Sequence, residues 1–117
     1  MGPRPSERDP MTDPKGPAGP IRSEMSSDAD MLEIIQMFVD EMPERVAALE
    51  DAWRVHDTEA LTRVAHQLKG ASPGYGYSSV GDAAAILERS LKSADQDLSS
   101  VQAQFDHLID LCSRVVV

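Results

Sequence analysis

LEIIQMFVDEMPERVAALEDAW, residues 32–53, carries the clearest periodic pattern in this 117-residue chain. Its apolar stripe has members three or four residues apart: Leu32, Ile35, Val39, Met42, Val46, Leu49 and Trp53. This spacing holds the stripe on one face of an amphipathic α-helix. Because Pro43 removes one backbone hydrogen bond, the segment is predicted to be either one kinked helix or two helices split near Pro43. The unbroken stripe favours the kink.

Three later segments repeat the helical spacing. A second helix is predicted to begin at Asp57, a typical N-cap residue, and a third at Ser78 or Ser79. The apolar positions of these helices are, in chain order, Leu61, Val64, Ala65 and Leu68; Val80, Ala83, Ala84, Leu87 and Leu91; Leu98, Val101, Phe105, Leu108, Cys112 and Val115. No segment alternates apolar and polar residues, so no strand is predicted. The expected fold is all-α, an antiparallel up-down four-helix bundle.

The N-terminal part of the chain has a different composition. Six of the eight prolines and three of the seven glycines lie within the first 20 residues, where few apolar side chains occur. Such a segment cannot form a core. We therefore expect residues 1–28 to be a flexible tail, either free or serving as a linker, and residues 29–117 to be a single bundle domain.

Charge and length exclude several classes of function. The chain has 11 basic and 20 acidic residues, a formal net charge of −9, which disfavours nucleic-acid binding. No stretch is long and apolar enough for a membrane span, and the single cysteine, Cys112, cannot form an intramolecular disulfide. We expect a monomeric cytoplasmic protein that binds neither membranes nor, given the absence of a ligand-spaced His or Cys pair, a metal of its own.

His66 is the most informative side chain of the second helix. On a helical wheel it lies opposite Leu61, Val64 and Leu68, while Thr62, Arg63, Lys69 and Gly70 lie within about 60° of it. His66 is thus predicted to face solvent in a small basic patch. Gly70 costs about 1 kcal/mol relative to alanine in a helix, a cost explained if a partner approaches closely. An ordinary surface histidine, with Gly70 belonging to the helix end at Pro73, would give the same pattern.

An exposed imidazole in such a patch suits phosphoryl transfer. Near pH 7 it is mostly neutral, and its unprotonated nitrogen is a nucleophile that can accept a phosphoryl group. Lys69 and Arg63 would offset charge on the transferring oxygens.

The string AHQLKGASPGYGYSSVGDAAAILE, residues 65–88, resembles the histidine phosphotransfer (HPt) family. The matching positions are His66, Leu68, Lys69, Gly70, Ser72, Gly76, Leu87 and Glu88. Further similarity at Phe38, Glu41, Pro43, Leu49 and Asp57 extends the resemblance over residues 30–115. The sequence departs from the family pattern at Ala71, Pro73 and Gly74, which leaves the end of the second helix open.

The resemblance implies a four-helix bundle that carries a phosphoryl group and has no kinase activity. His66 would accept the group from a receiver-domain aspartate and pass it on, with Lys69 beside the phosphoryl group and Gly70 leaving room for the receiver. Arg63 and Gln67 would have auxiliary roles. Mg²⁺ would come from the receiver, so no intrinsic cofactor is expected.

Several apolar residues of the first helix lie off its main stripe, namely Met31, Ile34, Met37 and Phe38. Either this segment wraps over the end of the bundle, or it forms an apolar dock for a receiver helix. For the second case we assign partner contacts to Ile34 and Phe38, and to Thr62 beside His66.

The sequence therefore predicts a stand-alone phosphorelay intermediate of two-component signalling. Two alternatives stay open. The chain could be a docking adaptor that is not phosphorylated, or a phosphotransfer module from a larger chemotaxis-type or hybrid kinase.

Overall fold

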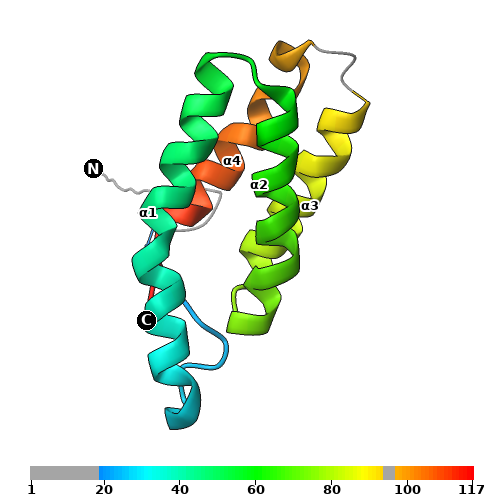
Figure 1. The fold of residues 1–117 in the computed structure, drawn as a ribbon. Helices are drawn as coiled ribbons and strands as arrows, with labels where there is room; N and C mark the ends of the chain where they lie inside the picture. The colour runs from blue at the N-terminus through cyan, green and yellow to red at the C-terminus, as the bar shows by residue number, and fades with distance from the viewer. Residues whose placement is uncertain (1–18, 94–96) are drawn as a thin grey trace, which may run out of the picture.

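Four α-helices form the body of the structure, a computed structural model that describes residues 19–93 and 97–117. They are α1 (Leu32–Arg54), α2 (Thr58–Ala71), α3 (Ser78–Lys92) and α4 (Gln102–Ser113). In Figure 1 the chain runs up the page through α1, down through α2, up through α3 and down through α4. Short 3₁₀ turns lie at Ala29–Met31, Ser72–Tyr75 and Leu98–Val101. The predicted four-helix architecture is confirmed.

α1 continues through Pro43 as a single helix, so the alternative of two split helices is wrong. An internal proline costs about 3 kcal/mol. This cost is offset because α1 buries apolar side chains on both sides of Pro43, including Ile35 and Leu49, and each such side chain stabilises the fold by about 1.5–3 kcal/mol. The kink itself stays a prediction.

A tight turn joins α1 to α2. Asp57 is the N-cap of α2, as predicted, and its carboxylate accepts a hydrogen bond of 3.0 Å from the backbone nitrogen of Ala60. His56 precedes it with a left-handed backbone, φ 59°, and an exposed side chain. The capped turn fixes where α2 starts and therefore which face carries His66.

α2 extends to Ala71 and passes directly into the 3₁₀ turn Ser72–Tyr75, with Pro73 in the first positions of that turn. Gly76 then reverses the chain with φ 88°, a conformation that favours glycine. Gly81 of α3 packs against this corner, because a Cβ at Gly81 would lie 2.9 Å from the Pro73 ring. The corner holds α2 and α3 close together, and these two helices share the largest helix–helix interface.

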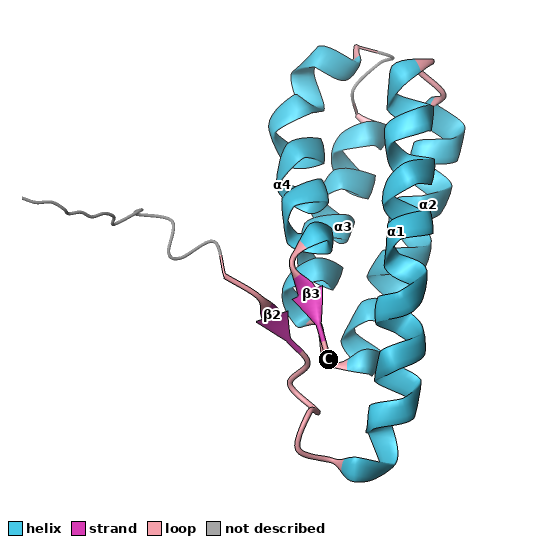
Figure 2. Ribbon diagram, turned by 90° about the vertical axis from the view of Figure 1, so that its left-hand side faces the viewer, coloured by secondary structure: helices cyan, strands magenta, loops and turns pink. Residues whose placement is uncertain are grey.

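Residues 19–28, here called the N-terminal strap, are bound to the opposite end of the chain. β2 (Ile21–Arg22) pairs in parallel with β3 (Val115–Val116), as Figure 2 shows. The backbone nitrogen of Ile21 also donates to the Arg114 carbonyl at 2.7 Å, and that of Glu24 to the Gly76 carbonyl at 2.8 Å.

Two predictions are wrong for the N-terminal strap. Strands are present, although two residues each are too few to show alternation in the sequence. The predicted tail does not extend to residue 28, because Ile21, Ser23 and Glu24 are hydrogen-bonded to the bundle. Residues 1–18 lie outside the described part of the chain. Within that part, no helix is long and apolar enough to cross a membrane.

Candidate functional site

His66 lies on the outer face of α2. Its side chain is 65% exposed, whereas Leu61, Val64 and Leu68 of the same helix are buried in the core. The predicted exposure of His66 is thus confirmed, and it follows from the burial of the opposite face of the helix.

Glu88 on α3 is the principal partner of His66. Its side chain is only 7% exposed, and its Oε2 lies 2.8 Å from Nδ1 of His66. Its Oε1 lies 2.8 Å from Nζ of Lys69, and Nζ of Lys92 lies 3.6 Å from Oε2. A carboxylate in so enclosed a place is unfavourable unless it is paired and hydrogen-bonded. These three side chains therefore stabilise its charge.

The same contacts control the ionisation of Glu88. The hydrogen bond from Lys69, followed by that from His66, lowers the pKa of Glu88 from 4.5 to about 2 and outweighs the opposing effect of burial. Glu88 is therefore a carboxylate at neutral pH.

This charge state defines the tautomer of His66. Because a carboxylate only accepts hydrogen bonds, Nδ1 of His66 must carry the hydrogen in the 2.8 Å contact. The neutral ring then has its lone pair on Nε2, the nitrogen without a protein partner in the described residues. The site holds a histidine whose nucleophilic nitrogen is defined by its acidic neighbour.

A shallow hollow surrounds His66, and we call it the His66 hollow. Its lining includes Thr62, Arg63, His66, Gln67, Glu88 and Lys92. Three of the predicted site residues, Arg63, His66 and Gln67, are thus brought together. Thr62 also lines the hollow, while its Oγ1 donates to the Thr58 carbonyl at 2.8 Å.

Lys69 and Gly70 lie on the next turn of α2. Lys69 is 41% exposed, and its ammonium is engaged with Glu88. A Cβ built on Gly70 would meet no atom within 4 Å, so nothing inside the fold requires a glycine there. The phosphotransfer roles assigned to these residues stay predictions.

The partner contact predicted for Phe38 is wrong. Its side chain is 3% exposed and stacks on Tyr75 and Tyr77, with ring centroids 4.8 and 5.3 Å apart. Phe38 therefore packs against the corner after α2, as in the alternative in which this segment covers the bundle end. Ile34 is 42% exposed, and its partner contact stays a prediction.

Glu88 was not predicted to take part in the site beyond its match to the family pattern. A signal was present, since Glu88 lies four residues after Ala84 and three before Leu91, both buried on the stripe of α3. A charged residue on an apolar stripe indicates a buried partner or a functional site. Lys92 was also not predicted. It lies one turn after Glu88 on α3, and it joins the site through its contact with that carboxylate.

Other reactive groups lie apart from this site. Burial raises the pKa of the Cys112 thiol to about 12, which makes it unreactive at neutral pH. Among residues 19–93 and 97–117, no three His, Cys, Asp or Glu side chains gather in a group able to hold a metal ion.

Comparison with known families matches residues 33–116, from the first turn of α1 to the end of β3, to the Hpt domain. Comparisons with curated proteins and with solved structures gave no match. The matched region contains the whole site and leaves the entire N-terminal strap outside.

Proposed function

Because the chain belongs to the Hpt domain family, whose members are phosphocarrier modules of two-component signalling, we propose that it is a phosphorelay intermediate. His66 accepts a phosphoryl group from a receiver-domain aspartate and passes it to a second receiver. The observation that carries this proposal is the 2.8 Å contact between Glu88 and Nδ1 of an exposed His66, which leaves the lone pair on Nε2.

The transfer step uses that lone pair. Nε2 attacks the phosphorus of the aspartyl phosphate, an N–P bond forms, the P–O bond breaks, and the aspartate leaves as a carboxylate. The imidazole ring keeps its Nδ1 hydrogen and becomes positively charged. Glu88, already ionised, stabilises that charge through its hydrogen bond with Nδ1. Transfer to the next receiver reverses these changes and restores the neutral ring.

Cations beside His66 support the reaction in two ways. Lys69 keeps Glu88 ionised through the 2.8 Å contact, and it adds positive charge one helical turn from the reacting nitrogen. Arg63 lines the His66 hollow and offsets charge on the phosphoryl oxygens, with Gln67 as an auxiliary contact. Mg²⁺ is supplied by the receiver rather than by this chain.

Gly70 provides access for the receiver. Its missing side chain serves no internal contact, since a Cβ would point into open space. A larger residue at this position would occupy the surface one turn from His66, where the receiver must approach. We propose that the protein performs this role as a cytoplasmic monomer.

The function is tested by incubating the protein with a phosphorylated receiver domain and Mg²⁺. We expect an acid-labile, alkali-stable phosphoprotein that His66→Gln does not form. His107→Gln removes another exposed histidine and should leave labelling unchanged. Labelling of the His66→Gln variant would contradict the proposal, and receiver binding without any labelling of the wild type would support the adaptor alternative.

A further inference from the structure

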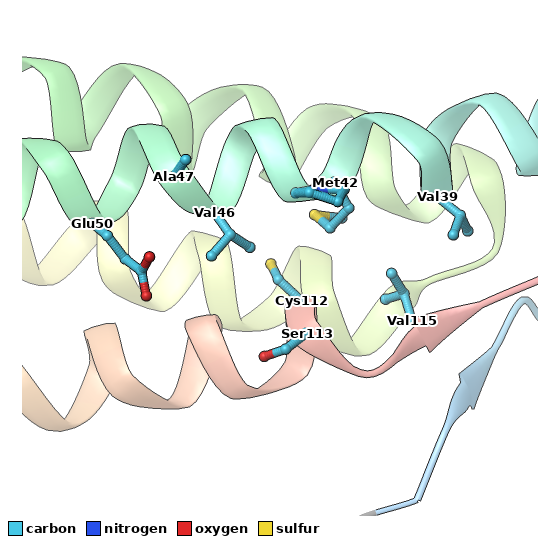
Figure 3. Close-up of a pocket in the computed structure, with 9 residues that line it drawn as sticks. Val39, Met42, Val46, Ala47, Glu50, Cys112, Ser113 and Val115 are labelled. Carbon is cyan, nitrogen blue, oxygen red and sulfur yellow. The ribbon is translucent and has the colours of Figure 1, made fainter.

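The His66 hollow contains two cations, whereas a second hollow of the bundle is mostly apolar. Arg63 from α2 and Lys92 from α3 both line the His66 hollow. The second hollow, between α1 and the end of α4, is shown in Figure 3, and its described lining is apolar apart from Glu50 and Ser113. A negatively charged phosphoryl group would therefore find compensating charge in the first hollow and not in the second.

Lys69, the cation that the family pattern places beside the phosphoryl group, is already bound to Glu88. Its Nζ lies 2.8 Å from Oε1 of that carboxylate, which is a hydrogen-bonding distance. Lys69 is not among the described residues that line the His66 hollow. Because the Glu88 side chain is only 7% exposed, loss of this contact would leave an enclosed charge with fewer partners. Lys69 is thus better placed to hold Glu88 than to bind an anion on His66.

Lys92 is held more loosely than Lys69. Its Nζ lies 3.6 Å from Oε2 of Glu88, beyond the usual length of a hydrogen bond, and its side chain is 66% exposed. Oε2 also accepts the Nδ1 hydrogen of His66, so the Lys92 ammonium lies near the imidazole ring. Because a lysine side chain is long and flexible, this ammonium can turn toward His66 while Glu88 keeps both of its short hydrogen bonds.

The other charges of the hollow leave room for an anion between α2 and α3. Arg63 makes no ion pair with any residue of the ranges 19–93 and 97–117. Glu59, the other carboxylate in the lining besides Glu88, lies seven residues before His66, about 10 Å along α2. A phosphoryl group on His66 would thus have one available cation on each of the two helices.

We infer that Lys92 binds the phosphoryl oxygens of phosphorylated His66 and thereby shifts the transfer equilibrium toward the phosphorylated histidine. The inference rests on the proposed function. No covalent bond changes in this step: the ammonium keeps its three hydrogens and exchanges its 3.6 Å contact with Glu88 for contacts with the phosphoryl oxygens. Glu88 keeps the hydrogen bonds from His66 and Lys69, and it compensates the positive charge that the ring gains.

Lys92→Gln tests this role, with Arg89→Gln as its matched control. Arg89 lies in the same last turn of α3 and is exposed, but it is not among the described residues that line the His66 hollow. Each change removes one positive charge, so a general effect of net charge would be equal in both variants. We expect Lys92→Gln to lower the equilibrium ratio of phosphorylated His66 to phosphorylated receiver about fivefold, and Arg89→Gln to change it less than about twofold. Lys92→Arg keeps the cation and should restore most of the ratio.

A second measurement distinguishes binding of the phosphoryl group from a structural role of Lys92. Phosphoramidate, a small donor that needs no docked receiver, is used to phosphorylate His66 in each variant. The pKa of the phosphoryl group, followed by ³¹P NMR, should be lower in the wild type than in Lys92→Gln, because a nearby ammonium favours the more highly charged form. Thermal melts should be similar for all variants, since an exposed lysine contributes little to folding.

The outcomes separate the two proposals. An equilibrium ratio that is equal in Lys92→Gln and Arg89→Gln, or a phosphoryl pKa that Lys92→Gln leaves unchanged, would overturn the role of Lys92 alone, provided that a receiver phosphorylates the wild type on His66. A wild type that no receiver phosphorylates would overturn the proposed function itself.

Discussion

Two enclosed polar side chains, Glu88 beside His66 and Ser23 in the N-terminal strap, are satisfied in different ways. Ser23 is bonded to backbone: its Oγ donates to the Tyr75 carbonyl at 2.6 Å and accepts from the Met25 nitrogen at 3.0 Å. Glu88 is bonded to side chains that are largely exposed, His66, Lys69 and Lys92. Backbone partners hold Ser23 in the fold, whereas Glu88 is held by side chains that lie at the site.

The glycines of the two regions differ in what surrounds them. Gly76, at the strap, has φ 88°, and an added Cβ would collide with Ser23 Oγ and lie 2.9 Å from the Glu24 nitrogen. Gly70, near His66, has open space in the direction of a Cβ. The fold requires a glycine at position 76, whereas nothing inside the fold requires one at position 70, and we propose that Gly70 serves receiver access instead.

Glu88→Gln should have the largest effect on transfer. Glutamine cannot supply the negative charge that stabilises the phosphorylated ring, and loss of such an orienting partner typically costs 10–100-fold in activity. We expect single-turnover transfer from a phosphorylated receiver to slow by about 100-fold. Ser23→Ala should leave this rate unchanged while lowering stability by about 1 kcal/mol. Equal losses of rate in the two variants would remove the distinction between the regions.

Gly76→Ala should have the largest effect on stability. Alanine is strained at φ 88° and would displace the strap, so we expect the free energy of unfolding to fall by about 2–3 kcal/mol. Urea denaturation measures this change. Gly70→Ala is the matched control and should raise stability by up to about 1 kcal/mol. A stabilised Gly76→Ala variant would show that the strap does not contact the corner as described.

Gly70→Leu should retain the stability of the protein but impair the access of the receiver to His66. Leucine is a better helix former than glycine and meets no neighbour at this position, so stability should be retained or increased. Transfer from a receiver should fall about tenfold, because the side chain obstructs approach to His66. Phosphorylation by phosphoramidate should change little. Normal transfer from the receiver would contradict the proposed role of Gly70.

The lowered pKa of Glu88 predicts a smaller effect, a dependence of protein stability on pH. Its pKa in the folded protein is about 2, below the ordinary value of 4.5, so folding favours the ionised form. The stability advantage of the wild type over Glu88→Gln should be fully present above pH 4.5 and decline as the pH falls toward 2. Urea denaturation at pH 7, 4.5, 3 and 2 measures the difference. An advantage that grows on acidification would contradict the ion pairing of Glu88.

The helices and the exposure of His66 could be predicted because both depend on local periodicity. The stripe of α1 and the N-cap at Asp57 are each defined by residues within a few positions of one another. The exposure of His66 follows from the burial of Leu61 and Leu68 on the same helix.

The remaining features depend on contacts between distant residues. His66 and Glu88 are 22 positions apart, and their contact requires the register of α2 against α3 that the Pro73–Gly76 corner sets. The strap pairs residues more than 90 positions apart through strands too short to leave a pattern. Phe38 lies off the α1 stripe and was assigned a partner contact in one of two alternatives, but it is buried and stacks on Tyr75 and Tyr77.

The central claim, that His66 reacts through Nε2 while Glu88 holds its Nδ1 hydrogen, is tested most directly by NMR of protein labelled with ¹⁵N-histidine and phosphorylated by a receiver. We predict a phosphorus coupling to Nε2 of His66, together with a retained hydrogen on Nδ1 that is lost or shifted in Glu88→Gln. A phosphorus coupling to Nδ1 of His66, or phosphorylation of another residue, would contradict the account.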